Sequence, residues 1–105
     1  MENYLLATTT LETRDDARSL SRRLVDLGAA GCVQIIGPIE STYRWKGKIE
    51  TAQEWLCLIK TTKQGFENVK RIVNEIHPYD LPELVALPID EGTEAYLSWL
   101  SSGVL

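Results

Sequence analysis

Residues 32–62, CVQIIGPIESTYRWKGKIETAQEWLCLIKTT, decide the fold of this chain. Two runs rich in apolar and β-branched residues, 32–45 and 49–62, flank Lys46-Gly47-Lys48. Such runs are typical of strands and the central glycine favours a tight turn, so the stretch predicts one long β-hairpin. Gly37-Pro38 interrupts the first run, which predicts a bulge or bend at that point.

The length of this hairpin predicts that it bends or projects beyond the body of the domain. Residues 32–45 would extend over about 45 Å at roughly 3.3 Å per residue. A chain of 105 residues folds into a body only about 33 Å across. The hairpin carries Tyr43, Trp45 and Trp55. Because exposed aromatic patches usually mark contacts, we expect a second subunit to cover it.

The two cysteines, Cys32 and Cys57, are predicted to stay unpaired. With Gly47 at the centre of the turn, paired positions sum to about 94, so Cys57 would face Gly37. The two sulfur atoms would then lie about 16 Å out of register, too far apart for a disulfide. A cytosolic chain would in addition keep its thiols reduced.

A first helix is predicted after an N-terminal strand at residues 3–11. Thr13 is expected to cap it, with its side chain accepting from the backbone N–H of Asp16. Gly28 is expected to end it. Apolar residues at spacings of three and four form the stripe expected to face the core, namely Ala17, Leu20, Leu24 and Leu27.

The second half of the chain predicts a helix, a strand and a short last helix. Thr62 can cap a helix over residues 63–76, and Pro78 prevents its continuation. Residues 83–89, ELVALPI, predict the fourth strand. The stripe of the 63–76 helix is Phe66, Val69, Val73 and Ile76. The last helix is expected to be capped by Asp90 or Thr93 and to point Tyr96, Leu97 and Leu100 inward.

The order of these elements predicts the fold class. Strand, helix, strand, strand, helix, strand and a terminal helix correspond to an α+β, ferredoxin-like β-α-β-β-α-β sandwich with a long central hairpin. The length suits one domain, residues 1–105. Two helices on one face of an antiparallel sheet leave its other face bare. This is a second reason to expect an oligomer.

Composition excludes several classes of function. The formal charge is −4 and the basic residues are dispersed, which argues against binding to nucleic acid. No apolar run is long enough to cross a membrane. The N-terminus, MENYLLATTT, lacks the basic region of a signal peptide, so we expect a cytoplasmic protein. Phosphate-binding loops and nucleophile-elbow motifs are absent, and we expect no enzymatic activity.

The polar residues of HPYDLPE, residues 77–83, suggest the wall of a binding site. His77 is the only histidine, and Cys32 and Glu83 are the partners with which it could hold a metal ion. Two other interpretations stay open for His77, a residue at a helix end bonded to backbone and, less favoured, a catalytic partner of Cys32. Lys60 could give the site a positive charge.

The runs GCVQIIGPIESTYRWKGKIE, EWLCLIKTT and HPYDLPELVALPI resemble the CutA family of divalent-cation tolerance proteins, in the family's order and over nearly the whole chain. Gln34 and Asp80 stand where many members carry asparagine and glutamate. The resemblance implies a tight trimer similar to the PII signalling proteins, and no established catalysis. It also implies tolerance of divalent metal ions, copper especially, and metal binding at the positions of Cys32 and His77. The family's recurrent cleft residues correspond to Tyr43, Trp45, Lys60, His77 and Glu83.

Three functions follow as expectations. The first is a trimeric cytoplasmic protein that binds divalent cations, copper above all, weakly and without an organic cofactor, using Cys32, His77 and Glu83. The second is a PII-like sensor that binds a metabolite or anion in clefts between subunits, although its hairpin turns too tightly to supply a long mobile loop. The third is a structural assembly module in which metal binding is incidental.

Overall fold

The computed structural model describes residues 3–105, and the strand predicted to begin at residue 3 begins at Tyr4. Met1 and Glu2, part of the predicted domain and of the N-terminus compared with signal peptides, lie outside the described residues. The elements follow in the predicted order. They are β1 (Tyr4–Leu11), α1 (Arg14–Asp26), β2 (Cys32–Trp45), β3 (Lys48–Thr62), α2 (Lys63–Ile76), β4 (Val85–Ile89) and α3 (Glu94–Ser102).

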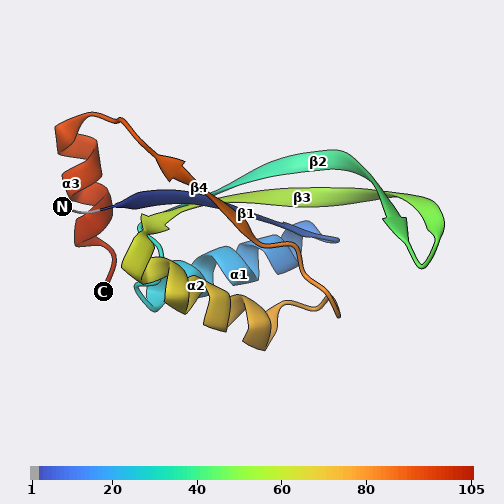
Figure 1. The fold of residues 1–105 in the computed structure, drawn as a ribbon. Coiled ribbons are helices and arrows are strands. Elements are labelled where there is room, and N and C mark those ends of the chain that lie inside the picture. The colour runs from blue at the N-terminus through green and yellow to red at the C-terminus, as the bar shows by residue number, and fades with distance from the viewer. Residues whose placement is uncertain (1–2) are drawn as a thin grey trace.

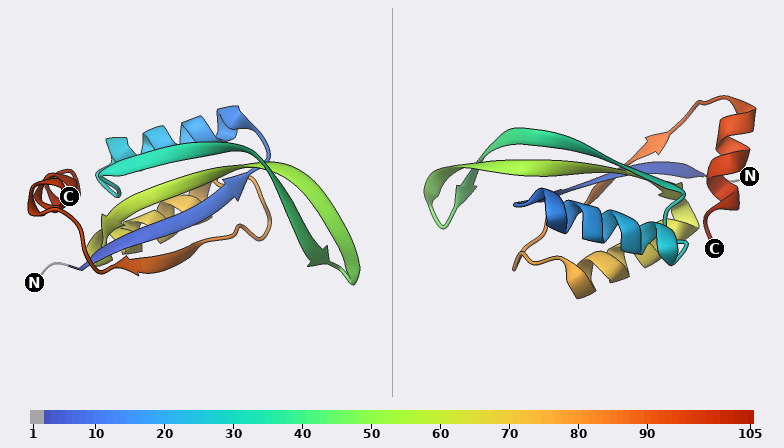
Figure 2. Two further views of the ribbon diagram at one scale, coloured as in Figure 1. Left: turned by 90° about the horizontal axis from the view of Figure 1, so that it is seen from above. Right: turned by 180° about the vertical axis from the view of Figure 1, so that it is seen from behind.

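The four strands form one antiparallel sheet in the order β2-β3-β1-β4. Helices α1 and α2 lie side by side on one face of it, and α3 lies at the end of the sheet near both termini (Figure 1). Two further views show the other face without a covering layer (Figure 2). This arrangement confirms the predicted ferredoxin-like α+β fold with its short C-terminal helix.

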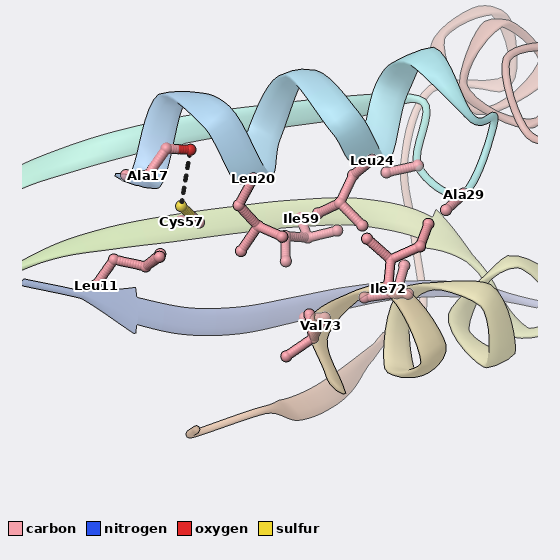
Figure 3. Close-up of a cluster of buried hydrophobic side chains, with 12 residues drawn as sticks. Leu11, Ala17, Leu20, Leu24, Ala29, Cys57, Ile59, Ile72 and Val73 are labelled. Atoms are coloured by element: carbon pink, nitrogen blue, oxygen red, sulfur yellow. Dashed lines mark hydrogen bonds between the residues drawn. The ribbon is translucent and has the colours of Figure 1, made fainter. Parts of the chain in front are cut away.

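The core lies between the sheet and the two helices. Leu20 and Leu24 of α1 and Ile72 of α2 meet Ile59 of β3, and these four side chains are almost fully buried (Figure 3). Each leucine or isoleucine buried in this way contributes about 1.5–3 kcal/mol to the free energy of folding. The core therefore belongs to one face of the sheet, called here the inner face, and the uncovered face is called the outer face.

The predicted first helix is confirmed by its caps. The Thr13 hydroxyl accepts from the N–H of Asp16 at 3.1 Å, and Gly28 takes a left-handed conformation just after the helix. The stripe is wrong at its last position because Leu27 is the residue at which the helix ends. Its side chain is half-exposed beyond the edge of the core.

The later helices confirm their predicted caps, Thr62 for α2 and Thr93 for α3. Both predicted stripes need a correction at one end. Ile76 is the last residue of α2 and is exposed, whereas Ile72, one turn earlier on the same face, is buried. Tyr96 points away from the core, and Leu100 is the fully buried residue of α3.

The long hairpin turns at Lys46-Gly47, and both of these residues have positive φ, as a two-residue type I′ turn requires. The predicted bulge is confirmed between Ile36 and Ile39, where β2 carries one residue more than β3. The predicted register was wrong by two residues, because the turn is centred between Lys46 and Gly47 rather than on Gly47 and because the prediction ignored the extra residue at the bulge. Cys57 faces Ile35, not Gly37, and both cysteines are free.

The hairpin projects as predicted, and the molecule measures 44 × 25 × 21 Å (Figure 1). The part of the hairpin beyond the bulge, residues 39–54, is called here the arm. Trp45 of the arm is 41% exposed. Trp55 was expected to be covered by a second subunit, but it packs beside the core of its own chain, under the Arg14 guanidinium. Its ring lies against the backbone of Gly37, where a Cβ atom would overlap the ring.

Candidate functional site

The predicted site residues separate into three places within one chain. Tyr43, Trp45 and Glu83 line an open groove under the arm. Cys32 and Lys60 lie opposite each other on β2 and β3, toward the other end of the sheet. His77 is buried at the end of α2, where its ring contacts Thr10 of β1.

The groove lies where the arm extends beyond the end of β1. The arm forms one wall, and residues 79–83, between α2 and β4, form the other. Its cavity volume is about 1230 Å³. Tyr43, Trp45 and Glu54 point into the groove together. Alternate residues of a strand share a face, and so do residues that pair across two strands. Tyr43 pairs with Glu50, which lies four residues from Glu54 on β3, so all three side chains are on one face.

The His77 imidazole uses both ring nitrogens inside the chain. Its Nδ1 accepts from the backbone N–H of Tyr79 at 3.2 Å, so its Nε2 carries the proton and donates to the Thr10 carbonyl at 2.9 Å. Burial lowers the pKa of His77, against smaller raising effects of the Thr10 carbonyl and of Asp16 and Glu54. These bonds confirm the interpretation of His77 as a residue at a helix end, bonded to backbone.

Tyr79 and Glu54 form a contact that the sequence did not predict. The Tyr79 hydroxyl donates to Glu54 Oε2 at 2.7 Å, and the Tyr79 ring meets the His77 ring edge-on. Burial raises the pKa of Tyr79 strongly, and the bond to Glu54 adds to this effect. The contact fixes the 79–83 segment against β3. Only the neighbouring prolines hinted at a rigid segment, and nothing hinted at Glu54.

Lys60 and Cys32 belong to a separate cluster on the outer face. The Lys60 ammonium lies 3.4 Å from the Tyr96 hydroxyl, to which it donates, and 5.3 Å from the centre of that ring. Trp99 stacks at a tilt beside Tyr96. Lys60 therefore gives no charge to the groove of its own chain, contrary to the site that the sequence suggested.

The predicted metal ligands do not meet within one chain. Cys32 pairs with Lys60 and Lys60 with Leu6, whereas His77 bonds to Thr10, four residues further along β1. Four residues of a strand span about 13 Å. Glu83 Oε2 instead accepts from the Thr8 hydroxyl at 3.3 Å. Among residues 3–105, no group of three histidine, cysteine or acidic side chains is placed to hold a metal ion.

Cys57 takes no part in either region. It is fully buried on the inner face, and its thiol lies 3.9 Å from the Ala17 carbonyl (Figure 3). Burial raises the pKa of Cys57, partly offset by the Ser21 hydroxyl. The partly exposed Cys32 is therefore the accessible thiol among the described residues.

The part of the chain that the structure describes contains no helix with the length and apolar character needed to cross a membrane. This finding agrees with the short helices of the fold.

Comparison with known proteins identifies the family of this chain. The family model of the CutA1 divalent ion tolerance protein matches residues 5–103. Divalent-cation tolerance protein CutA of Thermus thermophilus is 44% identical over 100 residues, which cover 95% of this chain and 95% of that protein. The chloroplastic CutA protein of Arabidopsis thaliana is 38% identical over 98 residues. That match covers 93% of this chain but 54% of the plant protein.

Solved structures have the same fold. The Thermus thermophilus divalent cation tolerance protein superposes with a TM-score of 0.94 at 40% identity, with full coverage of both chains. The Archaeoglobus fulgidus CutA, described as a periplasmic divalent cation tolerance protein, superposes with a TM-score of 0.91 at 33% identity, also with full coverage. The chain belongs to the CutA1 divalent ion tolerance protein family.

Proposed function

We propose that this protein is a homotrimeric, cytoplasmic divalent-cation tolerance protein that binds copper and is not an enzyme. The observation that carries the proposal is the family membership, since relatives across nearly the whole chain are named for divalent-cation tolerance. The cytoplasmic location is a separate part of the proposal, to be tested by cell fractionation, because one structural relative is described as periplasmic.

The exposed apolar residues of the outer face support the trimer. Ile36, Val85 and Leu87 are 48%, 57% and 61% exposed, and alternation places all three on this face. Ile36 lies on the edge strand β2, and Val85 and Leu87 lie on the opposite edge strand β4, so exposed apolar side chains occur at both edges of this face. Such a face is typical of surfaces that a partner covers. Trp45, on the same face of the arm, extends the contact surface. We expect Trp45→Ala to weaken the trimer by about 2 kcal/mol, as the loss of a packed interface aromatic does.

The arrangement of the predicted ligands limits how copper can bind. Cys32, His77 and Glu83 are separated within one chain, so they cannot form one site without a second subunit. Cys32 lies on the outer face, where the proposed trimer would bring a second chain, and its thiolate is a soft ligand suited to copper. We therefore propose that Cys32 contributes to copper sites shared between subunits.

Calorimetric titration with copper(II) and zinc(II) tests the proposal, with light scattering on the same samples. We expect wild type to bind with a stoichiometry tied to the trimer, and Cys32→Ser to lose copper binding while staying trimeric. Cys57→Ala is the matched control, because it removes the other thiol and should leave binding unchanged. Trimeric wild type that binds neither metal, or binding that Cys32→Ser leaves intact, would contradict the copper site.

His77→Ala completes the set. Both nitrogens of His77 are engaged, so we expect this variant to lose stability while keeping copper binding. Loss of copper binding in a folded trimer would instead make His77 a ligand whose ring turns away from Thr10 in the assembly.

A ligand sensor is the second candidate, favoured by the groove with Tyr43 and Trp45 on its wall. In this case a bound metabolite would change the contact between the arm and a partner. Lys60 could then contribute only from a neighbouring subunit, since it lies away from the groove of its own chain. A screen of metabolites by calorimetry separates this candidate from metal tolerance, because a sensor responds without added metal.

A further inference from the structure

The outer part of the arm takes its direction from the place where the arm leaves the body of the chain. Residues 42–51 are all exposed, so their own packing does not hold them in one position. The arm leaves the body at the bulge of β2, beyond the end of β1 (Figure 2). Residues 39–45 span about 23 Å at roughly 3.3 Å per residue, so a change of about 10° at the bulge would move Trp45 by roughly 4 Å.

The side chain of Trp55 lies at this place and connects three elements. Trp55 belongs to β3 and pairs with Leu11, the last residue of β1, where β3 loses that neighbouring strand. Its ring packs beside the core and lies against the backbone of Gly37, at the bulge of β2. The Arg14 guanidinium, at the start of α1, lies 5.8 Å from the centre of the ring, where it is attracted by the π-electrons. The ring therefore holds the arm to both the sheet and α1.

Gly37 is matched to this ring by its size. A Cβ atom at position 37 would overlap Cε3 of Trp55 and lie 2.7 Å from Cδ2, so any other residue would have to displace the ring. The backbone itself does not require glycine there, because Gly37 is not among the described residues with positive φ. Gly47 is the opposite case, since its φ of +81° favours glycine while a Cβ would meet no described atom within 4 Å. The hairpin therefore uses one glycine for the turn and the other for the ring.

We propose that Trp55 is the positioning residue of the arm, with its ring held in the space that the missing Cβ of Gly37 leaves. The ring fixes the direction of the arm in the free chain, so that Trp45 is already in place when a second subunit approaches. An arm ordered beforehand loses less conformational freedom on association, which strengthens the contact without a further interface residue. The inference rests on the proposed homotrimer and is independent of copper binding.

Trp55→Leu and Gly37→Ala test the fit from its two sides. The first keeps an apolar side chain beside the core but removes the ring, and the second keeps the ring but takes its space. We expect each to loosen the arm, and the double variant to be no worse than Trp55→Leu alone, because the added methyl group then enters space that the ring has vacated. Ile72→Ala is the matched control, since it removes core contacts on α2 toward the other end of the core from Leu11 (Figure 3).

Residual dipolar couplings of the backbone amides measure the direction of the arm. They are recorded on the separated chain, isolated by size in a Leu87→Asp background, so that no second subunit orders the arm. The couplings of residues 42–51 should fit the alignment of α1 and α2 when Trp55 and Gly37 are unchanged. In Trp55→Leu and in Gly37→Ala they should fall by about half or more, because the arm then samples several directions.

Subunit exchange between isotopically labelled and unlabelled protein, followed by native mass spectrometry, measures the consequence for assembly. We expect exchange to be roughly 10-fold faster in Trp55→Leu and in Gly37→Ala, since a loosened arm contacts its partner less persistently. Ile72→Ala should exchange as wild type does, because it weakens the core and leaves the arm in place. Circular dichroism confirms that each variant is folded, and either of the two arm variants alone is sufficient for the test.

Three results would overturn the inference. The first is an arm whose couplings fit the helices equally well with and without the ring. The second is a trimeric protein in which neither arm variant accelerates exchange. The third is equal acceleration by Ile72→Ala, which would show that the stability of the chain controls assembly. Wild type that forms no trimer would contradict the proposed function instead, and the dipolar couplings would still decide whether Trp55 directs the arm.

Discussion

The two faces of the sheet are built from alternate residues of the same strands, yet they differ in almost every property. On the inner face Ala7, Cys57 and Ile59 are fully buried under two helices. On the outer face Leu87 and Val85 are more than half exposed. One strand therefore encodes two surfaces at once, one that stabilises the chain alone and one that is available for association and binding.

The reactivity of the two cysteines gives the largest expected contrast between the faces. Cys57 is buried on the inner face and burial raises its pKa, so we expect a maleimide to label it at least ~10³-fold more slowly than in the unfolded chain, because access requires opening of the core. Mass spectrometry after timed quenching measures both sites. Cys32 should label faster in Leu87→Asp, which disturbs the outer face, and Cys57 should not.

Equal labelling of the two thiols in folded wild type would break the contrast. A rate at Cys57 that rises with Leu87→Asp would show that assembly, and not the core alone, protects the inner face.

Truncation of one leucine on each face gives the next largest effect. Leu24→Ala leaves a cavity between α1 and the sheet and should lower the free energy of unfolding by about 3 kcal/mol. Leu87→Ala removes the same atoms from an exposed site and should change the unfolding of a separated subunit by less than about 0.5 kcal/mol. Urea denaturation at several protein concentrations distinguishes chain stability from assembly. Similar losses, independent of concentration, would contradict the division between the faces.

The smallest expected effect is the pH dependence of stability that His77, at the end of α2, contributes. Burial places the pKa of His77 below 6.5 in the folded chain, so the unfolded chain takes up this proton first as pH falls. The free energy of unfolding should therefore decrease as pH falls through 6.5 and level off below the folded pKa. One proton limits the slope to about 1.4 kcal/mol per pH unit.

Urea denaturation of wild type and His77→Gln at pH 7.5, 6.5 and 5.5 measures this contribution. The variant should be less stable at pH 7.5 and less dependent on pH. An identical pH dependence in both proteins would mean that His77 is not held neutral by its bonds to Thr10 and Tyr79.

Local patterns predicted most of the fold. Caps at Thr13 and Thr62 and the turn at Gly47 depend on residues close in sequence, and all three are confirmed. The predicted register of the hairpin failed because the turn is centred just before Gly47 and because one extra residue at the bulge shifts every pair from there to Cys32. Leu27 and Ile76 failed because a helical stripe shows no sign of where the covering sheet ends.

The candidate site was less predictable because it depends on long-range contacts. His77 bonds to Thr10 across 67 positions, and Tyr79 to Glu54 across 25. No spacing rule connects such residues. The family resemblance placed Tyr43, Trp45, Lys60, His77 and Glu83 in one cleft. Within this chain the first two and Glu83 line one groove, whereas Lys60 and His77 do not line it.

The bulge at Gly37-Pro38 also sets the phase of the arm. Before it, odd-numbered residues such as Ile35 face the helices, and after it the odd-numbered Tyr43 and Trp45 face the groove, while β3 keeps one phase throughout. Residues that pair across two strands share a face, so Tyr43 and Trp45 lie on the same face as their partners Glu50 and Lys48. Deleting one residue at the bulge would keep these pairs and the direction of both rings, and would remove only the change of phase in β2. Inserting one pair of residues between the bulge and Tyr43 would instead turn both rings to the opposite side, and a second inserted pair would restore their direction.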